Sequence, residues 1–432
     1  MLRNYLPIPT YSCIWHRLRS LRNETDVGAT DKPHHRFSGT ILLFLIKTGQ
    51  GMDLNTVFQR LNTGSKKWSQ YPDDVLPMWV ADMDFPVAAP IVQALKNRLE
   101  HPMLGYSVPQ QALRETLVRH LAHRYGWQVE AEDLVFLPGV EPGVNMALHA
   151  LVAPTATVLV QTPNYSPLLQ APANWNLARV DLPFQADAQG CYPTDIAALE
   201  QMLPENGALL LSNPHNPLGK VFEQDELLAI GEACVRRDTL IISDEIHADL
   251  LFDGRRHIPI ASLNPAIAAR SVTLMSASKA WNIAGLKTAF AVVQNPELRK
   301  RFNSGRLGLV DSVNALGLEA TEVAYREGSQ WLEQVVAYLQ GNRDYLADAI
   351  KTRFPGISMN LPQSTYLAWL DCSGLGLENP QAFFLQHARV ALSDGLEFGD
   401  DCGQYVRLNF GCPRPMLEEG LARMERSLRN TR

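Results

Sequence analysis

Strand-like apolar runs alternate with amphipathic segments through the middle of the chain. Runs of four or five residues with the length of buried strands occur at residues 134–137, 157–161, 209–212, 240–243, 272–275 and 289–293. Segments with helical spacing of apolar residues separate several of them, at residues 141–151, 195–203 and 224–236. Strands that are apolar on both sides and alternate with helices predict a parallel sheet covered by helices on both faces.

The pattern changes on either side of this region. Residues 76–84 are apolar and extended, and residues 90–100 and 110–125 have helical spacing. From about residue 295 the chain favours long helices, the longest at residues 331–353. Short strands follow at residues 366–370 and 405–410, and a last helix begins at Pro415. We therefore expect a large α/β domain over residues 95–325. A smaller α+β domain would take residues 326–432, joined by an N-terminal arm of residues 52–94.

The first 51 residues have a different composition from the rest. They mix Arg, His and Pro with one apolar run at residues 41–46, which is too short to span a bilayer. The run also lies too deep in the chain for a secretory signal, and an organelle transit peptide is the weaker alternative. Because the globular pattern begins at Met52, we expect residues 1–51 to be a poorly ordered extension.

Composition limits the classes of function. The 432 residues suffice for two domains, and their formal net charge is −6 without a dense run of Lys or Arg. This excludes a nucleic-acid-binding face and favours a small-molecule partner. The cysteines lie far apart without a Cys-x-x-Cys pair, which favours reduced thiols in a cytoplasm and argues against a metal site. The six are Cys13, Cys191, Cys234, Cys372, Cys402 and Cys412.

Lys279 follows the predicted strand at residues 272–275, within a cluster of small and hydroxyl residues. Ligands of α/β proteins bind at the carboxyl ends of strands, and a partly desolvated lysine is a good Schiff-base nucleophile. Hydroxyl and backbone N–H groups beside it suit a phosphate. A solvated lysine in an ordinary turn fits this stretch equally well, so the choice depends on the other strand ends.

Residues suited to binding a ligand also follow three other predicted strands. A turn with two prolines and a glycine holds Asn216 after residues 209–212, although asparagine is common in ordinary turns. Asp244 and Glu245 follow residues 240–243, where two acids are costly unless they cap a helix, pair with a cation or bind a ligand. Gly139 precedes a predicted helix whose N-terminus offers N–H groups to an anion.

A lysine, an aspartate, an asparagine and a phosphate-binding helix start at the strand ends of one sheet can together bind pyridoxal phosphate. The chain resembles the fold-type-I pyridoxal-phosphate enzymes of the class I/II aminotransferase superfamily, and within it the cystathionine β-lyases of the MalY/PatB type. The resemblance runs from about residue 53 to the C-terminus. It is carried by ADMDFP at residues 81–86, NPHNP at residues 213–217, SDEIH at residues 243–247 and RLNFGCPR at residues 407–414. It implies pyridoxal 5′-phosphate as cofactor, a mostly parallel seven-stranded sheet in the large domain, and a homodimer with shared active sites.

The resemblance also implies roles for single residues. Lys279 matches the lysine that carries the cofactor and moves the Cα proton, and Asp244 matches the carboxylate beside the pyridine nitrogen. Asn216 matches the partner of the phenolic oxygen. Tyr165 matches the aromatic residue that stacks on the ring, although a core tyrosine has the same spacing. The implied phosphate ligands are the backbone of Gly139, Val140 and Glu141, with the side chains of Ser276, Ser278 and Lys287.

Further matches concern the substrate and the partner subunit. Arg407 matches the arginine that binds the substrate carboxylate, and Ala81 belongs to the substrate-binding motif. A surface ion pair is the ordinary alternative for Arg407. Tyr106 matches a tyrosine that reaches the partner's cofactor phosphate and would act in catalysis there, although a turn aromatic packed on its own subunit fits the spacing as well. His247 belongs to the expected cofactor site.

Three departures from the family's pattern bear on the reaction. Aminotransferases commonly have tyrosine where His247 stands and often threonine where Leu218 stands, so His247 favours β-elimination of cysteine S-conjugates over transamination. Glu141 places a carboxylate at the phosphate cradle, which is unfavourable unless its side chain points away. An aminotransferase and a non-enzymatic regulatory protein are the two alternative functions.

Overall fold

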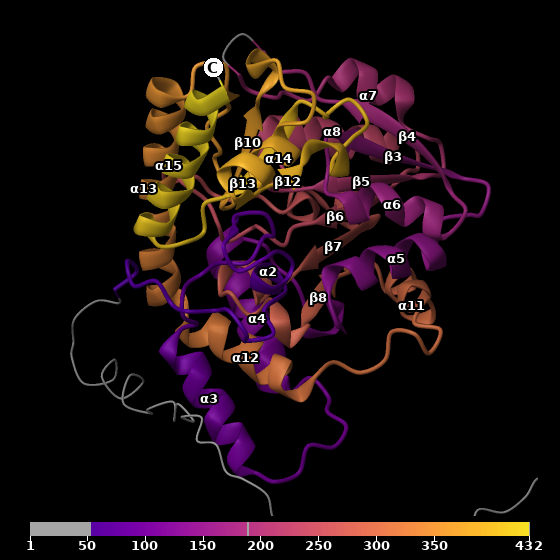
Figure 1. Cartoon of the computed structure of the whole chain (residues 1–432). Helices are drawn as coiled ribbons and strands as arrows, with labels where there is room; N and C mark the ends of the chain where they lie inside the picture. The colour runs from indigo at the N-terminus through magenta and orange to yellow at the C-terminus, as the bar shows by residue number, and fades with distance from the viewer. Residues whose placement is uncertain (1–52, 188–189, 432) are drawn as a thin grey trace, which may run out of the picture. The chain divides into compact units, whose positions relative to one another are not determined.

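A seven-stranded sheet lies at the centre of the part of the chain that the structure describes (Figure 1). The structure is a computed structural model and describes residues 53–187 and 190–431. β8 runs antiparallel to its neighbours β2 and β7, and the remaining neighbours are parallel, which confirms the predicted mostly parallel sheet. In spatial order the strands are β2 (Leu134–Leu137), β8 (Ala289–Val292), β7 (Ser271–Met275), β6 (Leu240–Asp244), β5 (Ala208–Ser212), β3 (Thr157–Thr162) and β4 (Ala178–Pro183).

Helices cover both faces of this sheet because its central strands are apolar on both sides. In β5, Leu209 and Leu211 belong to a core with α7 (Ile196–Met202), α8 (Gln224–Arg236) and α9 (Pro265–Ala268). Leu210 points to the opposite face, into a core with α5 (Val140–Leu151), α6 (Ser166–Asn174) and α11 (Pro296–Ser304). Each fully buried leucine contributes about 1.5–3 kcal/mol, so both helical layers are firmly attached.

Gly143 sets how closely α5 approaches the sheet. A Cβ atom at this position would lie 2.5 Å from Leu274 Cδ2 and 2.8 Å from Leu137 Cδ1. Only glycine therefore lets the helix axis lie this near to β2 and β7. The close approach holds the N-terminus of α5, which begins after Gly139, at the carboxyl edge of the sheet.

Two parts of the pattern were predicted incompletely. β4 and α6 were missed, and β4 has the alternating sequence Ala-Arg-Val-Asp-Leu-Pro of an edge strand with one solvated side. Residues 76–84 were expected to be extended, but only β1 (Leu76–Pro77) pairs with another strand. The apolar residues of this stretch are buried by packing instead, Met78 and Met83 among them.

The C-terminal part contains a second, antiparallel sheet of β12 (Ser393–Asp394), β13 (Tyr405–Asn409), β10 (Leu367–Asp371) and β9 (Ser358–Met359). The long helices α13 (Ser329–Arg353) and α15 (Arg414–Thr431) pack side by side next to it (Figure 1). β1 pairs with β11 (Val390–Ala391), so the segment before α3 lies against this C-terminal part. The remaining helices are α2 (Lys66–Ser69), α3 (Ala89–Glu100), α4 (Gln111–Tyr125), α10 (Ala277–Ala280), α12 (Ala315–Glu327) and α14 (Pro380–Phe383).

Asp53–Arg432 form one compact unit, and the boundaries predicted within it at residues 94 and 325 remain predictions. The expected extension of residues 1–51 lies outside the described residues. Among the described residues, no helix is both long enough and apolar enough to cross a membrane, and no cluster of His, Cys, Asp and Glu is arranged to hold a metal ion.

Candidate active site

Three neighbouring strands end at one edge of the sheet, and the three residues predicted to be central to the site follow them there. β5, β6 and β7 are parallel neighbours in register, with Ser212 opposite Asp244. Asp244 is the last residue of β6, Asn216 lies in the turn after β5, and Lys279 lies in α10 after β7. The carboxyl ends of adjacent parallel strands thus bring together residues that are far apart in sequence.

Lys279 is partly buried, and its amine is held by a main-chain oxygen. Nζ donates a hydrogen bond of 2.8 Å to the carbonyl oxygen of Ala81. Burial, followed by the nearby Arg407, lowers the pKa of Lys279 to about 8, although Asp82 and Asp244 oppose the shift. A larger share of neutral amine is therefore present near pH 8 than for an exposed lysine, which suits a nucleophile or a base.

Asp244 is 8% exposed, and its carboxylate accepts a hydrogen bond of 3.1 Å from the backbone N–H of Ile246. Burial raises the pKa of Asp244 to about 7, while the Ile246 N–H and the Lys279 amine pull it down. A cation beside this carboxylate would relieve the cost of burying its charge. The position is suited to a positively charged ring nitrogen.

Arg407 lies in β13 and connects the two sheets. Its guanidinium donates to Asn216 Oδ1 at 3.0 Å, to Trp79 O at 3.1 Å and to Ser393 Oγ at 3.2 Å, and it lies 4.7 Å from the ring centre of Phe398. Burial lowers the pKa of Arg407 to about 10, and its Nε is buried without a hydrogen-bond partner among the described residues. The bond to Asn216 fixes the orientation of that amide and leaves its N–H donors free.

Glu141 and Tyr165 are joined by a hydrogen bond of 2.6 Å from the tyrosine hydroxyl to Glu141 Oε1. Burial, followed by the charge of Glu141, raises the pKa of Tyr165 above its ordinary value. This contact explains why a carboxylate is tolerated at the start of α5. The Glu141 side chain accepts the bond from Tyr165, while the Glu141 backbone N–H stays in the first turn of the helix. Glu141 thereby fixes the position of the Tyr165 ring.

The expected phosphate ligands lie at the start of two helices. No side chain caps α5 after Gly139, so the first N–H groups of that helix have no capping partner. Ser276 caps α10: its Oγ accepts a hydrogen bond of 3.0 Å from the Ser278 N–H and donates one of 2.6 Å to Thr288 O. Lys287 is exposed and adopts a positive φ of 50°. This arrangement is suited to an anion.

A cavity of about 710 Å³ lies beside α10. Three of the predicted residues line it, namely Ala81, Lys279 and Lys287. The opposite wall comes from residues 58–66 and 80–87, with Arg60 bonded to Asp82 and Asp84. Residues 58–66 and 80–87 thus form the part of the cavity wall that holds the Lys279 amine through Ala81 O.

The other predicted residues lie outside the lining of this cavity, His247 and Tyr106 among them. His247 is 3% exposed, its ring centre lies 6.4 Å from that of Tyr366, and its Nδ1 has no hydrogen-bond partner among the described residues. Burial, helped by Lys279 and Arg407, lowers the pKa of His247 to about 3. Tyr106 is 99% exposed in the single chain and lies outside the cavity lining, so its role stays a prediction.

Sequence reasoning missed two residues that hold the cavity wall. The Tyr366 hydroxyl donates to Ala81 O at 3.1 Å, the oxygen that also accepts from Lys279. The Asn282 amide donates to Met83 O at 3.0 Å and to Phe85 O at 2.9 Å. Asn282 lies three positions after Lys279 in the segment singled out from the sequence, which is the one signal that pointed to it.

Comparisons with known proteins show the family of the chain. Residues 73–424 match the family model described as aminotransferase class I and II. The chain belongs to this family. Cystathionine β-lyase PatB of Bacillus subtilis is 35% identical over 381 residues, which cover 86% of this chain and 98% of that protein. These findings confirm the resemblance inferred from the motifs.

Solved structures of the family superpose over most of the chain. The structure of OvoB is 42% identical with a TM-score of 0.84, and the match covers 87% of this chain and 99% of that one. Cystalysin from Treponema denticola, which contains a pyridoxal 5′-phosphate cofactor, is 29% identical with a TM-score of 0.85. That match covers 89% of this chain and all of cystalysin, so the fold-type-I assignment is confirmed.

Proposed function

We propose that this protein is a pyridoxal-phosphate-dependent carbon–sulfur β-lyase that cleaves L-cystathionine or a related cysteine S-conjugate to a thiol, pyruvate and ammonia. The observation that carries the proposal is the partly buried Lys279 amine, whose pKa is lowered to about 8, beside the buried Asp244 at one sheet edge. The name of PatB, a cystathionine β-lyase, supports the choice of reaction.

The residues present fit pyridoxal 5′-phosphate. Lys279 offers the amine that bonds the cofactor's aldehyde, and Asp244 offers the carboxylate for its ring nitrogen. Asn216, oriented by Arg407, keeps amide donors for the phenolic oxygen. Tyr165 would stack on the ring, and the buried His247, with an unpartnered Nδ1, would contribute to the ring's surroundings. The phosphate would take the N–H groups of Gly139, Val140 and Glu141 and the side chains of Ser276, Ser278 and Lys287.

When bound, this cofactor supplies an electron sink for the pair left at Cα after proton removal. The protein supplies the remaining requirements. Arg407 would bind the substrate carboxylate through its planar fork and so fix the bond to be broken. Lys279, with its lowered pKa, would take the Cα proton as a general base. Asp244 would hold the proton at the ring nitrogen, because its buried carboxylate favours a cation beside it.

An aminotransferase uses the same first proton transfer, so products must separate the two functions. The test incubates the enzyme with L-cystathionine without any 2-oxo acid and measures free thiol and pyruvate. A β-lyase releases both continuously. Release of neither, together with amino transfer when a 2-oxo acid is added, would establish the aminotransferase and refute the proposal.

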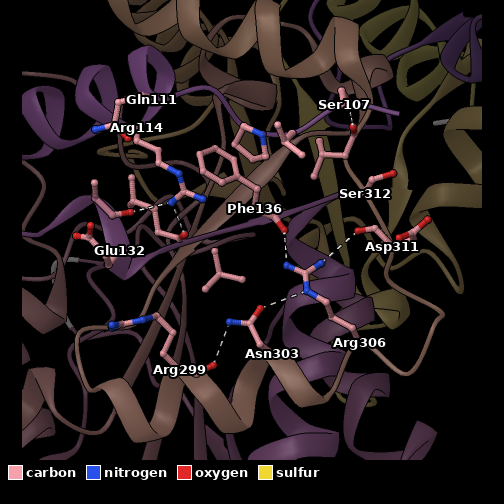
Figure 2. Close-up of a pocket in the computed structure, with 16 residues that line it drawn as sticks. Ser107, Gln111, Arg114, Glu132, Phe136, Arg299, Asn303, Arg306, Asp311 and Ser312 are labelled. Atoms are coloured by element: carbon pink, nitrogen blue, oxygen red, sulfur yellow. Dashed lines mark hydrogen bonds between the residues drawn. The ribbon is translucent and has the colours of Figure 1, made fainter. Parts of the chain in front are cut away.

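We further propose a homodimer, in which Tyr106 reaches the partner's active site. Large apolar side chains are exposed on two segments of the single chain, which are tied by the Ser107 hydroxyl donating to Val313 O at 2.9 Å. Ser107 and the residues around Asp311 also border the cavity in Figure 2. Such apolar exposure marks a contact surface. Its members are Met103, Leu104, Tyr106, Val108, Leu307 and Leu309.

Subunit mixing tests the shared site. Lys279→Ala chains and Tyr106→Ala chains are unfolded together and refolded, and mixed dimers are confirmed by mass. If each subunit lends its Tyr106 to the other, one site of the mixed dimer has both residues intact and activity returns. Activity that stays at the level of the parents would refute the shared site.

The five described cysteines are free, which supports the proposed cytoplasmic location.

A further inference from the structure

We infer that a cationic groove outside the active site binds a small phosphorylated anion. The groove encloses about 690 Å³ and is lined by α4, the turn at residues 255–257, the end of α12 and the start of α13. It shares no lining residue with the cavity beside Lys279. The inference therefore does not depend on the proposed lyase activity.

Positive charge is concentrated in this groove although the chain as a whole is acidic. Five arginines and three histidines line it, against two carboxylates, Asp249 and Glu333, while the formal net charge of the whole chain is −6. The cationic and histidine residues come from three segments that are far apart in sequence. They are Arg119, His120, His123, Arg124, Arg255, Arg256, His257 and Arg326.

Several of these groups have donors to spare. The side chains of Arg256 and His123 have no hydrogen bond or ion pair to any described residue. Arg119 donates a single hydrogen bond, of 3.1 Å, to Thr116 Oγ1 and keeps its other N–H groups. Arg119 lies 3.9 Å from Glu115 and Arg124 lies 3.9 Å from Asp249, distances too long for hydrogen bonds. Other members are already paired, Arg255 with Glu223 and Arg326 with Glu322 and Glu327.

The arginines that line the cavity in Figure 2 differ from those of the cationic groove, because they are bonded to the main chain. The three arginines of that cavity donate to main-chain carbonyls: Arg114 to Leu134 O, Arg299 to Val293 O and Arg306 to Phe136 O. These guanidinium groups hold loops and strand ends together. In the cationic groove, by contrast, the free arginine donors point to an exchangeable ligand.

The carboxylate of Asp249, at the bottom of the groove, is already paired with neighbouring side chains. The Tyr125 hydroxyl donates to Asp249 Oδ1 at 2.7 Å, and His120 Nε2 lies 3.4 Å from the same oxygen. Burial would raise the pKa of Asp249, but His120, Tyr125 and Arg124 more than compensate and hold it below its ordinary value. Asp249 thus stays an ionised part of the floor, and the guanidinium groups at the rim face solvent.

Phosphate is the ligand chemistry that matches these donors. A guanidinium fork makes two parallel charge-assisted bonds to phosphate oxygens, and adjacent phosphate groups can engage arginines from different segments. An acidic peptide would offer carboxylates to the same donors. None of the large apolar side chains that are exposed among the described residues lines the groove, which favours a small, highly charged molecule.

The test titrates inorganic pyrophosphate into the cofactor-loaded enzyme by calorimetry, with about 150 mM salt present to screen diffuse attraction. We expect one site per chain. Arg119→Ala and Arg256→Ala should each raise the Kd about tenfold, the effect of one charge-assisted hydrogen bond. Arg426→Ala is the matched control, because Arg426 and Arg119 are both 66% exposed and lie 4.0 and 3.9 Å from a glutamate.

All three variants should fold, because each substitution removes an exposed side chain. The absorbance of the bound cofactor verifies this. An unchanged Kd in Arg119→Ala and Arg256→Ala, an equal loss in Arg426→Ala, or no pyrophosphate binding would each overturn the inference. A deca-glutamate peptide is titrated in parallel. Arginine-dependent binding of that peptide without binding of pyrophosphate would assign the groove to an acidic protein segment and overturn the small-anion assignment.

Discussion

Replacing Arg407 with lysine keeps the positive charge but removes the planar fork. In the native protein the guanidinium is fixed by three acceptors, Asn216 Oδ1, Trp79 O and Ser393 Oγ. A single ammonium cannot retain these bonds and also present two donors to a substrate carboxylate. Losing one charge-assisted hydrogen bond costs about 1.5–3 kcal/mol, so kcat/KM for L-cystathionine should fall roughly 10- to 150-fold.

The assay measures pyruvate release over a range of L-cystathionine concentrations, with cofactor absorbance as the check on loading. Arg343→Lys is the matched control, because the Arg343 side chain is 3% exposed and is bound by Asp253 far from the cavity beside Lys279. The control should lose stability but keep kcat/KM. If Arg407→Lys kept its kcat/KM, the assignment of Arg407 as the carboxylate ligand would be refuted.

Four further predictions concern the cofactor site and the N-terminus. In cofactor-free protein, burial raises the pKa of Asp244 to about 7. The protonated Asp244 therefore contributes to the free energy of unfolding fully below about pH 4, and this contribution is lost as the pH rises through 7. Asp244→Asn should remove this loss in urea denaturation at pH 5 and pH 8, and an unchanged pH dependence would contradict it. The same variant should lower kcat by orders of magnitude. Borohydride reduction and peptide mapping should find the pyridoxyl group on Lys279, and finding it on Lys287 would reject the assignment. A chain starting at Met52 should fold, bind cofactor and stay active, whereas loss of cofactor binding would show that residues 1–51 contribute to the fold.

The main features of the sheet could be predicted because its central strands are buried on both sides. Runs such as Leu209–Leu211 have few interpretations besides a buried strand, and the polar residues after them then mark one edge. β4 was missed because its alternation, Arg179 and Asp181 between apolar residues, reflects a strand solvated on one side. Local pattern does not distinguish such a strand from a loop.

The contacts that complete the site could not be predicted for a different reason. The bond from Tyr165 to Glu141 depends on the directions of two side chains, one in the first turn of α5 and one just before α6. The bond from Lys279 to Ala81 O joins residues 198 positions apart and involves a backbone atom, which carries no sequence signal. Spacing predicted which strand ends matter, but not which carbonyl groups lie opposite them.

The polar character of β4 has a consequence for the behaviour of the protein in a crowded cell. β4 is the last strand at its side of the sheet, and an unpaired strand edge can recruit a strand from another molecule. Arg179 forms a 2.7 Å ion pair with Asp181 on this strand, and Arg179 also donates to Leu169 O at 2.7 Å. These charges make intermolecular strand addition costly. The same charged residues that obscure β4 in the sequence pattern therefore disfavour edge-to-edge association of the folded protein.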